Sequence, residues 1–275
     1  MPWLTVAPVL KQRVVTALVL SGVLLGVLFA APIAVFNACM ALVCALAAWE
    51  WAALALLPAW ARGLFVAIIL SAAWFMFHHA PQSLIVAWGC ALGVWVLALI
   101  WVSRYPRLTH FWANKPVRSL IGLGALLPTL LAFWYLRQQE QGVGWVVLLL
   151  CVVATADSGA YFTGRAFGKH KLAPSVSPGK SWEGVLGGWA GALLLAAGVS
   201  FFSPSLSLLT CLALVMPAAM ISVLGDLLES MLKREAGVKD SGSLLPGHGG
   251  FLDRIDGLTA AAPVFALSYL QVLGS

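Results

Sequence analysis

The sequence predicts an all-α polytopic membrane protein of about nine transmembrane helices, with a cytoplasmic N-terminus and a periplasmic C-terminus. Three observations lead to this fold class. Hydrophobic residues make up 61% of the 275 and charged residues only 9%, whereas a soluble domain is about a quarter charged. The apolar residues form runs of about 20, the length of helix that crosses ~30 Å of hydrocarbon. Lys and Arg gather in alternate loops between these runs, as expected for cytoplasmic loops.

Nine apolar runs are expected to span the membrane. The first run has no clear small-residue cleavage site after it, so we expect it to be retained rather than removed as a signal peptide. The third run is short and the eighth is long for one crossing. The approximate ranges are 14–31, 34–57, 62–78, 83–103, 118–137, 142–164, 184–203, 206–233 and 256–273.

Positive charges test this topology independently. With a cytoplasmic N-terminus, Arg137 alone among the sixteen Lys and Arg residues falls on the outer side. This asymmetry indicates a multi-pass protein of the bacterial inner membrane. Because the basic residues are scattered through short loops, the net charge of +6 reflects orientation, and no nucleic-acid partner is expected. The five cysteines lie in apolar runs without CxxC spacing and are interpreted as small buried residues.

Acidic residues concentrate in the second half of the chain. Eight of the ten lie within residues 157–256. We therefore interpret residues 1–140 as a transmembrane scaffold and residues 141–275 as the catalytic transmembrane region, with cytoplasmic loops at 165–183 and 233–256. Glu50, inside the second apolar run, is the exception, and it is either a satisfied buried carboxyl or part of a polar cavity.

The first of these loops, 165–183, mixes cations with hydroxyls, glycine and prolines. Ser177, Lys180 and Ser181 offer the hydroxyls, amides and ammonium that bind a triphosphate. Pro-Gly-Lys-Ser resembles the end of a P-loop, but the first glycine of that pattern is missing and no strand is expected before it, so a P-loop is rejected. The alternative is a basic loop held at anionic lipid headgroups.

Two pairs of carboxylates flank the second loop. Asp226 and Glu229 lie three residues apart on the eighth run, nearly on one helical face, and Asp253 and Asp256 repeat this spacing at the start of the last run. Carboxylates in membrane spans are costly and usually have a partner and a purpose. Oxygen ligands from two helices, without a His or Cys cluster, suit Mg²⁺ better than zinc. His248, between glycines, is either structural or a donor to phosphate.

A long polar pattern runs from Ser230 to Asp256: Ser-x-Leu-Lys-Arg-x4-Lys-Asp-x-Gly-x2-Leu-Pro-x-His-Gly-Gly-Phe-x-Asp-Arg-Ile-Asp. It resembles the signature of the phosphatidate cytidylyltransferase family, also called CDP-diacylglycerol synthases. The stretches 156–165 and 177–184 resemble two further blocks of that family. Together these blocks cover roughly residues 155–260, whereas the first half of the chain resembles the family only in its many spans.

The resemblance implies a Mg²⁺-dependent, homodimeric enzyme of phospholipid biosynthesis that transfers CMP from CTP to phosphatidate, giving CDP-diacylglycerol and pyrophosphate. It implies that Asp226 and Asp253 bind the metal, with a monovalent cation such as K⁺ nearby, and that the segment 180–183 binds the nucleotide. The residues expected to act in catalysis are Asp226, Asp253, Lys239, Asp256 and His248. Those expected to contact the substrates are Ser177, Lys180, Ser181, Glu183, Lys233, Arg234, Arg254, Asp157 and Arg165.

Two other functions stay open at this point. One is a membrane cytidylyltransferase that acts on a polyprenyl or other alcohol phosphate. The other is a cation transporter with Asp157, Asp226 and Asp253 along the ion path, since intramembrane carboxylates mark such paths. Acids gathered at one face beside a glycine-rich basic loop, without a clear inverted repeat, favour an enzyme. The Asp-x2-Asp-Gly-x2-Ala-Arg pattern of CDP-alcohol phosphotransferases is absent.

Overall fold

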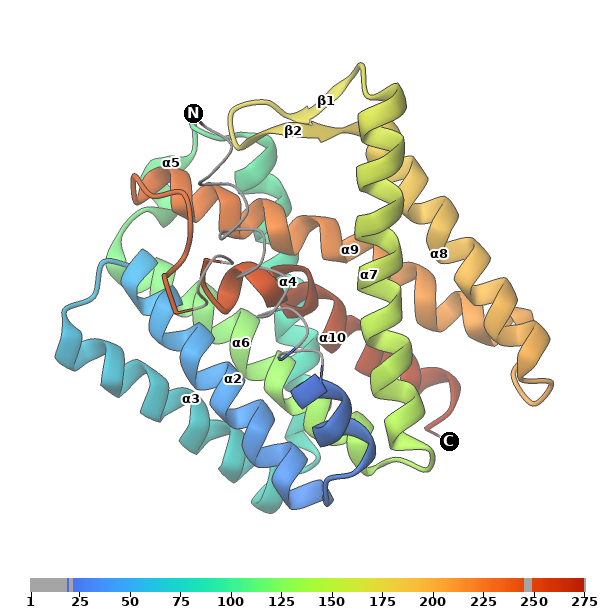
Figure 1. The fold of residues 1–275 in the computed structure, drawn as a ribbon. Coiled ribbons are helices and arrows are strands. Elements are labelled where there is room, and N and C mark those ends of the chain that lie inside the picture. Colours follow the sequence, from blue (N-terminus) through green and yellow to red (C-terminus); the bar gives the residue numbers. More distant parts are fainter. Residues whose placement is uncertain (1–18, 20–21, 245–248, 275) are drawn as a thin grey trace, which may run out of the picture.

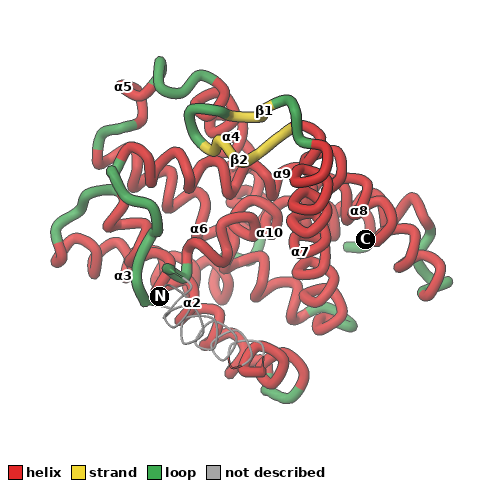
Figure 2. Tube along the Cα trace, turned by 45° about the horizontal axis from the view of Figure 1, so that its top comes forward, coloured by secondary structure: helices red, strands yellow, loops and turns green. Residues whose placement is uncertain are grey.

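The computed structural model describes residues 19, 22–244 and 249–274 and shows an almost entirely helical protein (Figures 1 and 2). Eight of the described helices are long and apolar enough to cross a membrane, which confirms the polytopic all-α fold. Most of the first predicted span lies outside the described residues, although residues 22–29 within it are helical. The eight helices are α2 (Ile33–Leu54), α3 (Ala59–His79), α4 (Ser83–Ser103), α6 (Lys115–Gln138), α7 (Gly142–Phe167), α8 (Trp182–Phe202), α9 (Leu208–Glu235) and α10 (Leu252–Val272).

The end of α2, the start of α6 and the end of α9 meet at one end of the bundle. Arg118 of α6 is 3% exposed and donates from Nη1 to the Leu54 carbonyl at 3.0 Å. Its Nη2 lies 3.7 Å from Oε1 of Glu235 on α9, and Trp51 Nε1 donates to the Arg118 carbonyl at 2.9 Å. The last turns of α2 are therefore fixed beside the last turn of α9. A short helix, α5 (Thr109–Trp112), precedes α6 at this end.

Helix α9 ends in a Schellman motif that turns the chain into the loop between α9 and α10. The Val238 N–H donates to the Lys233 carbonyl at 3.0 Å and the Gly237 N–H donates to the Arg234 carbonyl at 3.2 Å. Gly237 has a φ of 70°, which only glycine adopts without a Cβ penalty. This glycine therefore sets the direction in which the loop 236–251 leaves the helix.

Helices α7 and α8 lie side by side (Figure 1), and small residues line their contact. A Cβ at Gly188 of α8 would lie 2.6 Å from the Ala156 carbonyl oxygen of α7, and a Cβ at Gly159 would lie 2.6 Å from that of Gly187. Close backbone approach through small residues is the usual way in which membrane helices associate. The pair forms one wall of the site described below.

A two-stranded antiparallel hairpin joins these helices. Strand β1 (Lys171–Ala173) pairs with β2 (Ser177–Ser181), and Figure 2 shows the hairpin at the end of the helical bundle. The expectation that no strand precedes Ser177 was therefore wrong. The Pro-Gly-Lys-Ser segment is itself strand and α8 starts directly after it, so it does not form the strand, loop and helix of a P-loop.

Burial of one apolar side chain explains why this polar segment folds back as a hairpin. Val176, in the turn between the strands, is only 1% exposed. Its carbonyl accepts a hydrogen bond from Arg234 Nε of α9 at 3.2 Å. The hairpin is thus held against α9, a contact that local sequence propensity does not reveal.

Candidate active site

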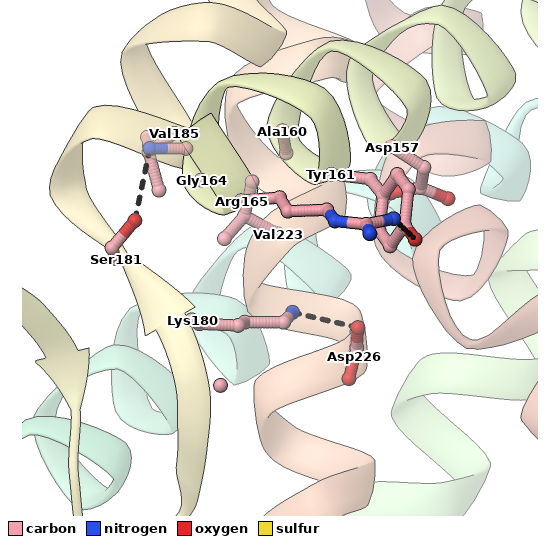
Figure 3. A pocket seen from close by; sticks show the side chains of 12 residues that line it. Asp157, Ala160, Tyr161, Gly164, Arg165, Lys180, Ser181, Val185, Val223 and Asp226 are labelled. Atoms are coloured by element: carbon pink, nitrogen blue, oxygen red, sulfur yellow. Dashed lines mark hydrogen bonds and ion pairs between the residues drawn. The ribbon is translucent and has the colours of Figure 1, made fainter. Parts of the chain in front are cut away.

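A cavity of about 390 Å³ opens between α7, β2, α8 and α9 (Figure 3), a volume within the range of small-molecule sites. Five of the predicted site residues line it, although they come from three separate stretches of sequence. These residues are Asp157, Arg165, Lys180, Ser181 and Asp226.

Lys180 and Asp226 form the polar centre of the cavity. Lys180 Nζ lies 2.7 Å from Asp226 Oδ2, joining β2 to α9, and both side chains keep partial exposure, 25% and 37%. Ser230, one turn further along α9, donates to Asp226 Oδ1 at 3.1 Å. Asp157 of α7 interacts electrostatically with both Lys180 and Asp226. An exposed ammonium beside an exposed carboxylate can bind a phosphate and a cation together.

Arg165 reaches the same cavity from the end of α7. Its Nη1 donates to Tyr161 Oη at 3.1 Å, one turn away, and both residues line the cavity (Figure 3). Tyr161 was not among the predicted site residues. Its place in the 156–165 block, four residues before Arg165 on one helical face, is the signal that could have identified it.

Ser181 and Glu183 order the start of α8. Ser181 Oγ accepts from the Gly184 N–H at 3.2 Å, which is an N-cap bond. The Glu183 carboxylate accepts from the Lys169 N–H at 3.1 Å and lies 2.6 Å from His170 Nδ1. Glu183 therefore closes the base of the hairpin and does not line the cavity.

A second cluster surrounds Lys233 of α9. Lys233 Nζ lies 2.6 Å from Asp253 Oδ1 and 3.3 Å from Glu229 Oε2. The other oxygen of Asp253 accepts from the Ser241 N–H at 3.0 Å and from the Gly250 N–H at 2.9 Å. Asp253 thus binds the lysine and two separate points, Ser241 and Gly250, of the loop that connects α9 to α10.

Asp256 links the two clusters. It interacts electrostatically with Asp226 on one side and with Glu229 on the other. The helices touch here, because a Cβ at Gly225 would collide with the Asp256 carbonyl oxygen and would lie 3.2 Å from Gly257 Cα. Asp226 and Asp253 therefore belong to one continuous network, although each pairs with its own lysine.

The carboxylates of this network suit a hard cation. Both carboxylate oxygens of Glu229 are buried and make no hydrogen bond within the described ranges, and the cation beside them is Lys233, 3.3 Å from Oε2. A buried carboxylate is costly unless it is paired. In the same ranges, no three His, Cys, Asp or Glu side chains surround one point. The arrangement fits Mg²⁺ held by one or two carboxylates together with substrate phosphates, the usual mode for this ion. Glu229 stood out by its spacing in the sequence but was not assigned to the site.

Four further predicted residues, all within the described part of the chain, do not line the 390 Å³ cavity. Ser177 begins β2, Arg234 holds the hairpin, and Lys239 is exposed in the loop after α9. Arg254 is exposed on α10 and lines a second, largely apolar cavity of about 450 Å³ together with α2, α6 and α7. His248 lies outside the residues that the structure describes.

Comparison with known proteins covers nearly the whole chain. Residues 11–272 match the model of the Cytidylyltransferase family. The chain belongs to this family. The membership that the signature at 230–256 led us to expect is confirmed. The match begins at residue 11 and so includes the first half of the chain. The first half therefore resembles the family in its sequence and not only in its number of spans.

Curated relatives show the same relationship. The chain is 44% identical to a phosphatidate cytidylyltransferase of Pseudomonas aeruginosa, over 94% of this chain and 96% of the relative. It is 41% identical to one of Haemophilus influenzae, over 96% of this chain and all of the relative. A relative of that name from Brucella suis is 43% identical over 66% of this chain and 62% of its own length. Similarity thus extends over full-length enzymes and not one motif.

Proposed function

We propose that this chain is a phosphatidate cytidylyltransferase of the bacterial inner membrane, acting as a homodimer with Mg²⁺. The observation that carries the proposal is the Lys180 and Asp226 pair, which faces a cavity and is connected through Asp256 to the carboxylates of the signature loop. The names of the full-length relatives support the substrates CTP and phosphatidate. Acidic side chains inside membrane spans are energetically costly, and they usually mark a functional site.

Two polyanionic substrates must meet at this site. An oxygen of the phosphatidate phosphate would attack the α-phosphorus of CTP, forming one P–O bond while the bond to the β-phosphate breaks and pyrophosphate leaves. Lys180 and Arg165 would offset negative charge at the cavity, and Lys233 would do so beside the loop. A phosphate monoester has its second pKa near 6 and is largely dianionic at pH 7, so no strong general base is required. Asp256 and Asp240 would then hold cations or order the loop between α9 and α10.

Asp226 is the better exposed of the two proposed metal ligands. Its carboxylate faces the cavity, whereas Asp253 engages Lys233 and two backbone amides. Asp253 would bind the metal only when Lys233 leaves its Oδ1. A bound Mg²⁺, with a monovalent cation such as K⁺ nearby, would neutralise charge on the phosphates and the leaving group.

The apolar cavity beside Arg254 supports a lipid acceptor. Side chains such as Phe36, Leu130 and Leu258 line it, and Arg254 supplies a guanidinium at its wall. A guanidinium pairs well with phosphate and an apolar cavity accepts hydrocarbon. A lipid phosphate satisfies both requirements, while a water-soluble acceptor would leave the apolar wall unused.

The test is synthesis by purified protein in detergent micelles with labelled CTP and Mg²⁺. We expect labelled CDP-diacylglycerol and equimolar pyrophosphate with phosphatidate, and a loss of at least about a thousandfold in Asp226→Asn, because this change removes the charge that the site requires. Glu140→Gln, at an exposed acid in the loop between α6 and α7, is the matched control and should retain full activity.

Turnover with polyprenyl phosphate but not phosphatidate would favour the other cytidylyltransferase. Cation flux in liposomes without pyrophosphate release would favour a transporter.

A further inference from the structure

Glu50 of α2 reaches across the protein into the loop between α9 and α10. It is 3% exposed, and its Oε2 accepts hydrogen bonds from Ser241 Oγ at 3.0 Å and from the Leu252 N–H at 2.8 Å. Ser241 lies within the loop 236–251, and Leu252, eleven residues further along the sequence, is the first residue of α10. A single carboxyl group from the first half of the chain therefore joins two separate points of the second half, Ser241 and Leu252.

The loop backbone is shaped to fit this carboxylate. A Cβ at Gly242 would collide with Glu50 Oε1, and a Cβ at Gly250 would collide with Glu50 Oε2. Only glycine at these two positions allows the loop to come so close. The contact is thus a close packing of backbone around a buried carboxyl group and not a chance approach of a long side chain.

The same loop residues connect Glu50 to the second carboxylate cluster. The Ser241 hydroxyl donates a hydrogen bond to Glu50 Oε2, and the Ser241 N–H donates one to Asp253 Oδ2. Asp253 in turn binds Lys233, which pairs with Glu229. Burying an ionised carboxylate is expensive unless hydrogen bonds compensate it. Oε2 of Glu50 meets that condition through Ser241 and Leu252, while Oε1 is buried without a hydrogen-bond partner among the described residues. Removing Glu50 would release both contacts together.

We propose that Glu50 is a positioning residue that holds Ser241 and Leu252 in place so that Asp253 and Lys233 are correctly placed for the reaction. This inference rests on the proposed function, but the ordering of the loop can be measured without any reaction. Glu50 acts through Ser241 and Leu252 and does not itself touch substrate. The chemistry that it supports is the placement of phosphate-binding and cation-binding groups.

The first experiment follows loop order by hydrogen–deuterium exchange in the full-length protein without nucleotide or metal. Glu50→Ala should speed exchange of amides within 241–252 at least tenfold, since it removes both hydrogen bonds, while helices α3 and α4 stay unchanged. Glu50→Gln keeps one oxygen acceptor of the same reach and should restore most of the protection. Glu50→Asp is one methylene shorter and should restore less. Ser241→Ala removes one of the two bonds without opening a large cavity and should give an intermediate effect.

The second experiment measures steady-state kinetics of the same variants. Glu50→Ala should lower kcat at least tenfold and raise the Mg²⁺ concentration for half-maximal rate, with KM for CTP within about threefold of the wild type. Glu50→Gln should recover much of kcat. Ser241→Ala should add little further loss in the Glu50→Ala background, because contacting residues couple. Glu140→Gln serves again as the control acid.

The outcomes separate this inference from the proposed function. Glu50→Ala could lower thermal stability while amide exchange in the loop, kcat and KM all stay as in the wild type. Glu50 would then be merely structural, and the inference fails. Equal loss in Glu50→Gln and Glu50→Ala would also overturn it, because hydrogen-bonding reach would then be irrelevant. If wild-type protein and Glu140→Gln make no CDP-diacylglycerol, the proposed function fails, and the exchange experiment still decides the role of Glu50.

Discussion

At the scale of single residues, four acids at or near the site have a specific neighbour. Lys180 pairs with Asp226, Lys233 pairs with Asp253 and Glu229, and Glu50 binds loop donors. Compensation of this kind is what makes carboxylates tolerable at membrane depth. The pairs differ in exposure: Lys180 and Asp226 face the cavity, whereas the Glu229 side chain is 1% exposed. The accessible pair is therefore the one expected to exchange its partner for substrate.

Substitution of Lys180 tests this expectation. Lys180→Met removes the ammonium that faces the cavity and keeps most of the side-chain length, so KM for CTP should rise at least tenfold, in line with the ~1.5 to 3 kcal/mol of a charged hydrogen bond. Steady-state kinetics with varied CTP measures the change. Lys171→Met, at an exposed position of β1 in the same hairpin, removes the same charge. An equal rise of KM in both variants would show that only the net charge of the hairpin matters.

At the scale of elements, the site depends on how closely α9 and α10 approach. Gly225 lies against the backbone of Asp256 and Gly257. This contact brings the carboxylates of the two helices into one network, because Asp226 follows Gly225 directly and Asp256 precedes Gly257. The crossing of the two helices therefore fixes the geometry of the acids.

Gly225→Ala should separate the helices. The new Cβ cannot fit against the Asp256 carbonyl, so we expect a lower Tm in detergent and a loss of activity of at least tenfold. Gly198→Ala is the matched control, since Gly198 lies in helix α8 with no atom within 4 Å of the Cβ position. There the intrinsic preference of helices for alanine should leave Tm unchanged or slightly raised. An unchanged Tm and rate in Gly225→Ala would show that the α9 and α10 contact adjusts freely.

At the scale of the whole molecule, the two halves of the chain are interlocked at one end of the bundle. Arg118 joins α2, α6 and α9, and Glu50 joins α2 to the start of α10. The division into a scaffold, 1–140, and a catalytic region, 141–275, stays an interpretation of the sequence. The first half contributes at least one buried charge to the loop of the second half.

The orientation of the molecule in the membrane can be tested with single cysteines in a variant that lacks the five native ones. Lys169→Cys lies at the hairpin end of α7 and Glu140→Cys lies just before the other end of α7. If the basic loops face the cytoplasm, an impermeant maleimide should label Glu140→Cys in cells with a permeabilised outer membrane. Lys169→Cys should react only after the inner membrane is broken. The reverse pattern would invert the predicted topology.

Much of the fold follows from sequence because apolar length and charge asymmetry act locally along the chain. The eight described spans agree with the predicted runs to within about four residues, as shown by α4 at Ser83–Ser103 and by α6, which starts at Lys115 where 118 was expected. The concentration of acids in the second half was also visible, with eight of ten within residues 157–256, and acids are expensive in apolar spans. The catalytic role of that half stays a prediction. The hairpin was missed, since burial of Val176 against α9 overrides the loop character of its neighbours.

The sequence by itself determined the class of protein, the positions of the spans and the family. It also pointed to Asp226 and Lys180, which line one cavity in the structure. These features depend on composition, on spacing within a helix and on a continuous motif, all of which are local. Only the tertiary structure decided which lysine meets which acid, that Glu183 closes a hairpin, and that Glu50 contacts Ser241 and Leu252. These contacts join residues up to 202 positions apart, and which helices come into contact is decided by packing of small residues between them, not by any pattern along one segment.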